Sequence, residues 1–206
     1  MPYFSGPEML LRIPALLIAI SFHEYAHARV SYALGDPTPK WTGRLTLNPL
    51  AHLDPIGLLM LWLFKFGWAK PVMVDPRYYS NRNGIVLTSL AGPLTNFSLA
   101  FITLVVIKLN ILGGLFAAFL EVLFSYNLVL AVFNLIPIAP LDGYKILTGL
   151  LPWRMSDKLA HLETYGPLIL IFIVYFNLVH IILDPFISIS LRVLDRLSDI
   201  LLIFRF

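Results

Sequence analysis

Two histidines four residues apart, with a glutamate directly after the first, are the residues whose spacing most directly suggests chemistry. His23, Glu24 and His27 form an H-E-x-x-H pattern inside an apolar run. On an α-helix, residues four apart share one face, so both imidazoles can bind the same metal ion. Glu24 would then lie beside that ion and could act as a general base toward a metal-bound water. The pattern therefore indicates metal-assisted hydrolysis.

The alternative interpretation is a polar patch on a helix that packs against other helices. Ionisable groups within an apolar segment are costly and need partners. The neighbouring Tyr25, Ala26 and Ala28 offer few. This cost favours a metal site over a packing patch.

A third metal ligand must come from elsewhere in the chain. A catalytic zinc ion takes three protein ligands and keeps its fourth position for water. Because the sequence has no cysteine, the third ligand must be a histidine or a carboxylate. Asp142, which follows Pro137 and Pro140, is one candidate, although Asp-Gly after prolines is also a common turn. His52 and Asp54 compete for the same position, and spacing alone leaves the choice open.

Two asparagines lie within apolar runs. Asn96 and Asn134 could donate hydrogen bonds to a substrate carbonyl or hold an extended substrate strand. The alternative is an amide contact between helices, which is common in membrane bundles. The residues alone slightly favour the alternative.

Composition predicts the class of protein. Apolar residues make up 58% of the 206 residues and charged residues 13%, against about a quarter charged in soluble domains. Mean hydropathy is +0.80. We therefore expect a single all-α polytopic domain in a lipid bilayer. The net charge of +3 is small and forms no basic stripe, which argues against nucleic-acid binding.

The apolar runs predict membrane-spanning helices at about residues 9–34, 84–109, 115–136 and 165–183. The first run lacks the basic start and the cleavage site of a signal peptide, so we expect it to be retained. The run 56–68 is short for a full crossing and is expected to be re-entrant or short.

Two further segments have weaker patterns. Residues 41–47 alternate weakly and could form a short strand or small β-hairpin. Residues 187–206 place leucines at helical spacing with charges on the other side, which predicts an amphipathic tail helix.

Basic residues suggest an orientation. If 56–68 is re-entrant, one side of the membrane carries most of the cations, namely Arg29, Lys40, Arg44, Lys65, Lys70, Arg77, Arg82, Lys145, Arg154 and Lys158. By the positive-inside rule that side is cytoplasmic. The H-E-x-x-H pattern and Asp142 would then lie in the cytoplasmic half of the membrane.

Four separated motifs carry a resemblance to a known family. They are His23-Glu24-Tyr25-Ala26-His27; the run from Gly43-Arg44-Leu45 through Asn48-Pro49 to His52-Leu53-Asp54-Pro55-Ile56-Gly57; Gly67-Trp68-Ala69-Lys70-Pro71-Val72; and Ala91-Gly92-Pro93-Leu94-Thr95-Asn96 together with Asn134-Leu135-Ile136-Pro137 and Ala139-Pro140-Leu141-Asp142-Gly143. In this order they resemble the site-2 protease family of intramembrane zinc metalloproteases, in its compact branch without PDZ or CBS domains.

The resemblance implies a role for each matched residue. His23, His27 and Asp142 would bind one zinc ion per chain, and Glu24 would be the catalytic base. Asn134 and Asn96 would lie near the substrate, and His52 with Asp54 would support the site from a loop. The fold implied is a three-helix core made by the first, third and fourth apolar segments. The substrate implied is the transmembrane helix of another membrane protein.

Two other classes of function compete with a protease. A metal-ion transporter could use the same ligands, but transporters usually show repeated halves, and none is visible in this sequence. A catalytically inactive membrane scaffold would not need the complete set of catalytic residue types. The compact chain favours a prokaryotic cell membrane.

Overall fold

The computed structural model describes residues 7–57, 70–81 and 83–203, and this part of the chain is helical. The long helices are α1 (Pro7–Ala33), α4 (Asn83–Lys108), α5 (Gly114–Asn134) and α9 (Val179–Ile203). The shorter elements are α2 (Thr38–Trp41), η1 (Pro49–Ala51), η2 (Pro76–Tyr78), α6 (Asp142–Leu150), α7 (Trp153–Glu163) and α8 (Gly166–Tyr175). The expected helices 9–34, 84–109 and 115–136 thus agree with α1, α4 and α5 within two residues at each end.

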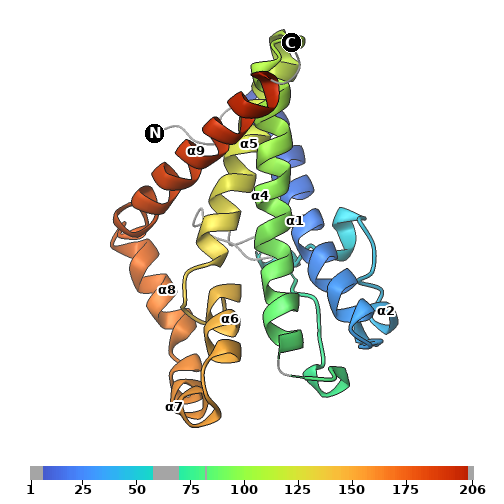
Figure 1. Cartoon of the computed structure of the whole chain (residues 1–206), viewed down its shortest axis with the longest axis vertical. Coiled ribbons are helices and arrows are strands. Elements are labelled where there is room, and N and C mark those ends of the chain that lie inside the picture. The colour runs from blue at the N-terminus through green and yellow to red at the C-terminus, as the bar shows by residue number, and fades with distance from the viewer. Residues whose placement is uncertain (1–6, 58–69, 82, 204–206) are drawn as a thin grey trace.

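Helices α1, α4 and α5 pack against one another and form the interior of the molecule (Figure 1). Small side chains with no exposed surface lie between them, including Ala19 on α1, Ala100 on α4 and Ala131 on α5. Small residues let helix backbones approach closely, which is how helices associate in membranes. Helix α6 packs on α4, and α9 contacts both α4 and α5.

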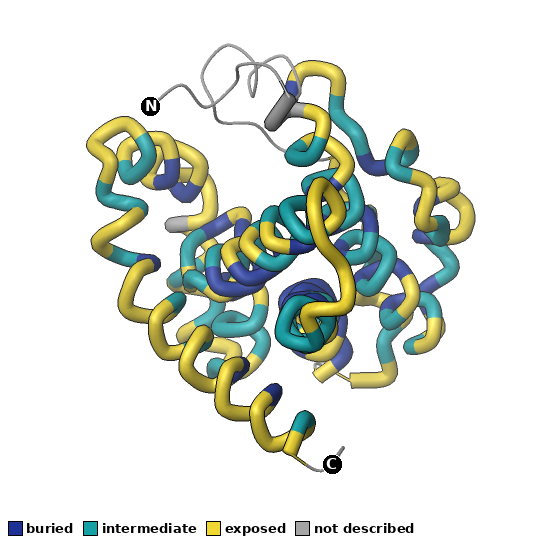
Figure 2. The backbone as a smooth tube through the Cα atoms, turned by 90° about the horizontal axis from the view of Figure 1, so that it is seen from above, coloured by how far each residue is buried: buried dark blue, intermediate teal, exposed yellow. Residues whose placement is uncertain are grey.

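The outer helices are far less covered than the inner ones. The helix that runs to the C-terminus, α9, is exposed over most of its length, whereas buried positions gather on the inner helices (Figure 2). Leu183 and Leu194 attach α9 to a cluster with Ala100, Leu128 and Val132. Helix α9 is thus held by one narrow apolar edge.

Two described helices, α4 and α5, are long and apolar enough to cross a membrane. Helices α7 and α8 pass the same test together, although they are bent by 60° relative to each other. Helix α1 is 27 residues long, but its histidines, Glu24 and Arg29 lower its apolar character. The chain is therefore a membrane protein by the length and composition of its helices.

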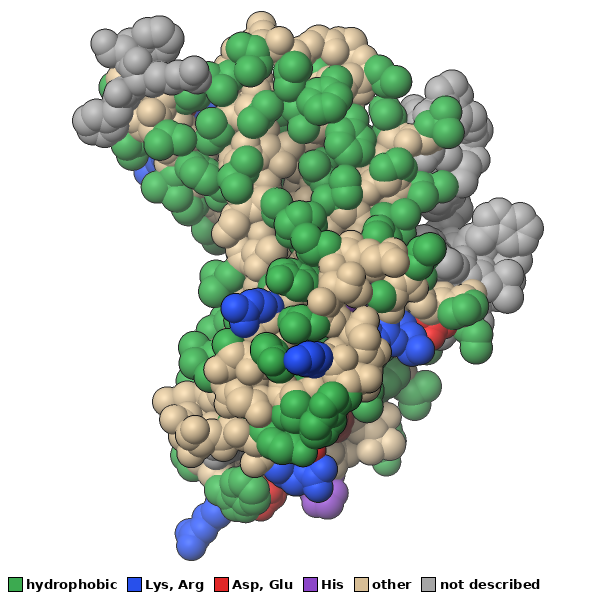
Figure 3. All heavy atoms as spheres, turned by 90° about the vertical axis from the view of Figure 1, so that its right-hand side faces the viewer, with side chains coloured by type: hydrophobic (Ala, Val, Ile, Leu, Met, Phe, Trp, Pro, Cys, Tyr) green, Lys and Arg blue, Asp and Glu red, His purple; other side chains and the backbone are tan. Residues whose placement is uncertain are grey.

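Charge is distributed unevenly along the long axis. On the face shown in Figure 3, apolar side chains cover the upper half, and most Lys and Arg side chains lie lower. Figure 1 shows α2, α6 and α7 at the end opposite the C-terminus. On this face, most Lys and Arg side chains therefore lie toward the end that carries the short helices α2, α6 and α7.

The expected strand at 41–47 is wrong. Residues 38–41 form the single turn of α2, and the residues that follow are turns and bends, with no strand among the described ranges. Pro39 at the second position starts this helical turn, and its carbonyl accepts the backbone N–H of Arg44. Gly43 then takes a positive φ of 68°. Local turn chemistry overrides a weak alternation.

The expected span 165–183 is also wrong in its boundaries. Helix α8 ends at Tyr175, and α9 begins at Val179 and continues through Pro185. Asn177 adopts a left-handed φ of 56°, which asparagine tolerates better than most residues. The predicted tail helix is confirmed as a helix, but it starts earlier than residue 187. The re-entrant prediction for 56–68 falls mostly outside the described residues.

Candidate metal centre

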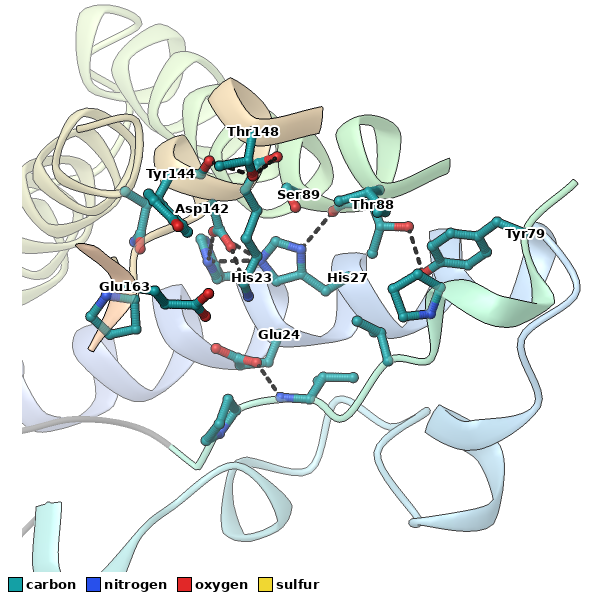
Figure 4. Close-up of a pocket in the computed structure, with 18 residues that line it drawn as sticks. His23, Glu24, His27, Tyr79, Thr88, Ser89, Asp142, Tyr144, Thr148 and Glu163 are labelled. Atoms are coloured by element: carbon teal, nitrogen blue, oxygen red, sulfur yellow. Dashed lines mark hydrogen bonds and ion pairs between the residues drawn. The ribbon is translucent and has the colours of Figure 1, made fainter. Parts of the chain in front are cut away.

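Three ligand-type atoms meet at one point between α1 and α6. His23 and His27 lie one turn apart on α1, and Asp142 lies at the first position of α6. Asp142 Oδ2 is 3.1 Å from Nε2 of His23 and 3.1 Å from Nε2 of His27. The two Nε2 atoms are 3.0 Å apart. All three side chains are buried (Figure 4).

The opposite nitrogen of each imidazole is held by an acceptor. His23 Nδ1 lies 2.6 Å from Asn96 Oδ1, and His27 Nδ1 lies 2.7 Å from the carbonyl oxygen of Thr88. A carbonyl oxygen accepts only, so each Nδ1 carries a proton, and in the neutral imidazole each Nε2 then presents a lone pair. Three electron-pair donors therefore face one another with no proton between them.

A small cation would relieve this arrangement. Tetrahedral zinc binds imidazole nitrogen and carboxylate oxygen at about 2.0–2.2 Å, which places its ligand atoms roughly 3.3 Å apart. The observed separations of 3.0–3.1 Å are close to that value. Imidazole with a carboxylate is also a donor set that suits zinc. The residues present thus fit a zinc ion, with a fourth position left for water or substrate.

The reversal between α5 and α6 brings Asp142 to the histidines. Pro137 and Pro140 follow the end of α5 and prevent its continuation. A side chain on Gly143 would place its Cβ 2.3 Å from the carbonyl oxygen of Leu135. Glycine therefore lets the start of α6 fold tightly against the end of α5, and this contact aims Asp142 at α1.

A second glycine leaves room for the imidazoles. Gly92 on α4 faces the two histidines, and a Cβ there would lie 2.4 Å from His27 Nε2 and 2.6 Å from His23 Nε2. Because both rings are held at Nδ1, they have little freedom to retreat. The absence of a side chain at Gly92 thus gives the two imidazoles the space they occupy.

Asp142 offers its two carboxylate oxygens to different partners, and Oδ2 is the one that faces the histidines. Its second oxygen, Oδ1, lies 3.8 Å from Lys145 Nζ, one helical turn along α6. Asp142 therefore presents one oxygen to the histidines and the other to a half-exposed ammonium group.

Glu24 lies beside the three ligands rather than among them. Its Oε2 accepts the backbone N–H of Val72 at 3.0 Å, which fixes the carboxylate against an extended loop segment (Figure 4). Glu24 and the three ligands line one cavity of about 430 Å³. Pro71, Val72 and Val74 form part of the same wall.

A polar chain links this wall to the neighbouring loop. Thr88 Oγ1 donates to Tyr79 OH at 3.1 Å, and Tyr79 OH lies 2.7 Å from Ser31 Oγ. Ser31 in turn donates to Asp36 Oδ2 at 2.7 Å, so the Tyr79 hydroxyl donates to Ser31. Asp36 also accepts the backbone N–H groups of Thr38 and Asp75. The chain ends on a carboxylate and holds residues 75–79 against α1.

The two asparagines occupy different positions. Asn134 lines the cavity, and its Nδ2 donates to the carbonyl of Leu130. Asn96 is fully buried and lies behind His23 instead of in the cavity wall. A position close to the substrate therefore remains open to Asn134, whereas Asn96 is reached only through His23.

His52 and Asp54 lie in the loop that follows α2. His52 Nε2 contacts the carbonyl of Thr46 at 2.8 Å, and Asp54 accepts the backbone N–H groups of Ile56 and Gly57. Neither belongs to the three-ligand cluster or to the residues that line the cavity. Among the described residues, Asp142 is the ligand-type side chain that the fold brings to the two histidines.

Two contacts of the site have no signature in the sequence. The carbonyl of Thr88 and the N–H of Val72 act through the backbone, so residue type does not mark them. The contact of Lys145 does have a signature in the sequence, because a three-residue spacing from Asp142 on a helix indicates it.

Comparison with known proteins places the chain in a family. The sequence profile of Peptidase family M50 matches residues 111–174. A relative from Bacillus subtilis is 40% identical over 184 residues, which cover 84% of this chain and 83% of that protein. The chain belongs to peptidase family M50. The resemblance to site-2 proteases is confirmed at this level.

Two further relatives are more distant. One from Mycobacterium tuberculosis is 32% identical over 71% of this chain, and the match spans 59% of that protein. One from Methanocaldococcus jannaschii is 30% identical over 71% of this chain and 73% of that protein. The three relatives are named "Putative zinc metalloprotease" YwhC, Rip2 and MJ0611, respectively. No solved structure matches the chain.

Proposed function

We propose that this protein is an intramembrane zinc metalloprotease that hydrolyses a peptide bond within or near the transmembrane helix of a membrane-protein substrate. The observation that carries the proposal is the meeting of His23, His27 and Asp142 in a cavity that Glu24 also lines. Zinc is the ion named for each of the three relatives, and the donor set suits it.

The residues divide the work of hydrolysis. When bound, zinc would polarise the scissile carbonyl and acidify a water molecule. Glu24 takes a proton from the attacking water and delivers it to the leaving amine. The Val72 N–H occupies Glu24 Oε2, which leaves Oε1 for that transfer. Asn134 lies in the cavity wall, where its amide can contact the substrate backbone.

The substrate must present an extended peptide. A peptide bond within an intact helix is hydrogen-bonded and shielded, so the substrate helix must unwind locally before hydrolysis. Residues 71–74 form neither helix nor strand, and Pro71, Val72 and Val74 line the cavity, where they provide a surface against which an unwound strand can lie.

We further propose a multi-pass arrangement in a prokaryotic cell membrane, with the site in its cytoplasmic half. In this arrangement α1, α4 and α5 are the family's three-helix core, and the bilayer surrounds the apolar half of the molecule. The gathering of Lys and Arg at the loop end in Figure 3 supports this orientation under the positive-inside rule.

The test compares the wild type with Glu24→Gln, which keeps the shape of the side chain but removes the base. Each protein is reconstituted in vesicles with tagged single-span membrane proteins of differing apolar sequence. New termini are identified by mass spectrometry, and zinc content is measured on the same samples. We expect cleavage within an apolar segment by the wild type alone, with equal zinc in both proteins.

Each competing function has its own outcome. Zinc movement across the vesicle membrane without any cleavage would indicate a transporter. Binding of the single-span proteins without cleavage would indicate an inactive scaffold. Equal cleavage by Glu24→Gln and the wild type would contradict the role of Glu24.

A further inference from the structure

A row of two buried amides stands behind His23, away from the cavity. Asn96 on α4 and Asn127 on α5 both have 0% of their surface exposed. Asn96 Oδ1 lies 2.6 Å from His23 Nδ1, and Asn96 Nδ2 lies 2.8 Å from Asn127 Oδ1. Neither amide lines the cavity, so neither is placed to touch a substrate.

Backbone carbonyls determine which way each amide faces. Asn127 Nδ2 donates to the carbonyl of Leu123 at 2.8 Å, which turns Asn127 Oδ1 toward Asn96. Asn96 Nδ2 donates one proton to that oxygen and the other to the carbonyl of Ala19 at 3.0 Å. Both amide protons of Asn96 are then used, so its oxygen must face His23.

The orientation of the Asn96 amide determines which ring nitrogen of His23 is protonated. A neutral imidazole has one protonated nitrogen, and the hydrogen bond at one nitrogen determines the state of the other. Facing a carbonyl oxygen, His23 Nδ1 must be protonated, so Nε2 presents its lone pair toward Asp142 and His27. An amide turned the other way would favour the proton on Nε2 and block ligation.

The two metal-binding histidines are therefore oriented by different means. His27 Nδ1 meets the carbonyl of Thr88, a backbone group whose direction follows from α4 itself. His23 Nδ1 meets a side-chain amide, which has two possible orientations and needs anchoring. Asn127 and the Ala19 carbonyl supply that anchoring from the two neighbouring helices.

We propose that Asn96 and Asn127 are positioning residues that hold His23 in its metal-binding tautomer, with Asn127 acting through Asn96. This inference rests on the proposed metal site and deepens it. It replaces the expected role of Asn96 as a substrate contact. The competing interpretation is a purely structural clasp, in which the amides join three helices and leave metal binding unaffected.

The experiment separates the two interpretations with an isosteric pair at one position. Asn96→Asp keeps an acceptor toward His23 but loses both amide donors. Asn96→Leu loses the acceptor and both donors. Asn127→Leu removes the distal anchor, and Leu128→Ala is the control, because Leu128 is equally buried on α5 but has no part in the row. Zinc affinity is measured by chelator competition in detergent, and thermal unfolding is measured on zinc-free samples.

The positioning role predicts that affinity and stability respond differently. Contacts that orient metal-ligating histidines typically contribute about 10–100-fold to metal affinity. Asn96→Leu should weaken zinc binding by about that factor, and Asn127→Leu should weaken it less. Asn96→Asp should bind zinc within a few-fold of the wild type although it unfolds at lower temperature. Leu128→Ala should lower the thermal stability and leave the zinc affinity unchanged.

A double variant tests whether Asn127 acts through Asn96. An aspartate at position 96 cannot turn a donor toward His23, so adding Asn127→Leu to Asn96→Asp should cause no further loss of zinc affinity. Histidine ¹⁵N chemical shifts of the zinc-free protein provide a second readout that needs no metal. The His23 Nδ1–H form should dominate in the wild type and decline in Asn127→Leu.

The outcomes distinguish this inference from the function on which it rests. If the wild type binds zinc and all folded variants bind it equally, the amides are a structural clasp and the positioning role is wrong. The same conclusion follows if Asn96→Asp loses as much affinity as Asn96→Leu. If the wild type itself binds no zinc, the proposed metal site fails, and the positioning role fails with it.

Discussion

The inner bundle (α1, α4, α5 and α6) and the outer arm (α8 and α9) are both apolar, yet they bury different kinds of side chain. Between α1, α4, α5 and α6 lie two imidazoles, two amides and a carboxylate, each with a defined partner. The arm buries leucines, a serine and a glycine, and its charged groups Asp195 and Asp199 are exposed. Buried polar groups cost free energy unless paired. The bundle therefore holds the paired polar groups of the candidate site, whereas the arm contributes apolar packing.

This contrast predicts that adding one methyl group inside the bundle, next to the histidines, has the largest effect on zinc binding. Gly92→Ala adds one methyl group at a position where Cβ would overlap the Nε2 atoms of both histidines. We expect nearly complete loss of bound zinc and of proteolysis, because the rings are held at Nδ1 and cannot both retreat. Zinc per chain in the purified protein is the measurement.

Gly113→Ala is the matched control for that change. Gly113 precedes α5, has no atom within 4 Å of a built Cβ and has a φ of −119°, which any residue adopts. Its zinc content should equal that of the wild type. Zinc retained in full by Gly92→Ala would mean that the ligand cluster is more loosely held than the contacts indicate.

A buried carboxylate outside the bundle sharpens the comparison. Burial alone would raise the pKa of Asp36, but hydrogen bonds from Thr38, Asp75 and Ser31 outweigh it and lower the pKa below the ordinary 3.8. A lowered pKa contributes stability above the unfolded value, and this stability is lost as pH falls through the folded value. Asp36→Asn should therefore destabilise the protein at neutral pH, by about 1.5–3 kcal/mol for a lost charge-assisted hydrogen bond.

The check is thermal unfolding between about pH 3 and 7. The wild type should lose stability below about pH 4, and Asp36→Asn should lose less over the same interval. The exposed Asp157→Asn serves as control and should follow the wild type. Equal acid sensitivity in all three proteins would show that Asp36 does not hold the loop.

The smallest effect is expected on the arm. Lys108 Nζ lies 2.6 Å from carboxylate oxygens of Asp195 and Asp199, both of which are exposed. Exposed ion pairs contribute about 0–1 kcal/mol, so Lys108→Met should shift unfolding only slightly and leave zinc content unchanged. A large loss of zinc with this variant would break the distinction between bundle and arm.

The parts of the site that follow from helix geometry could be predicted from the sequence. The spacing of His23 and His27 places them on one helix face whatever the fold, and the long apolar runs match α1, α4 and α5. Spacing alone leaves Asp142 as one of several candidates for the third ligand. Its position depends on a tight reversal between α5 and α6, which only the resemblance indicated beforehand.

The remaining features depend on groups that residue type does not reveal. The carbonyl of Thr88 and the N–H of Val72 are present in almost any sequence, so nothing marks them in advance. The break at Asn177 lies within the apolar run 165–183, where residue type does not mark it, and Pro185 lies inside α9 without ending it. Asn96 could be singled out, but its role depends on which way its amide faces.

Metal content of the purified protein tests the central claim most directly, measured for the wild type, Asp142→Ala and His52→Ala. We predict about one zinc per chain in the wild type and in His52→Ala, and loss of zinc in Asp142→Ala. Zinc lost with His52→Ala and kept with Asp142→Ala would contradict the ligand set. Absence of zinc from the wild type, even after incubation with the metal, would contradict the assignment as a metalloprotease.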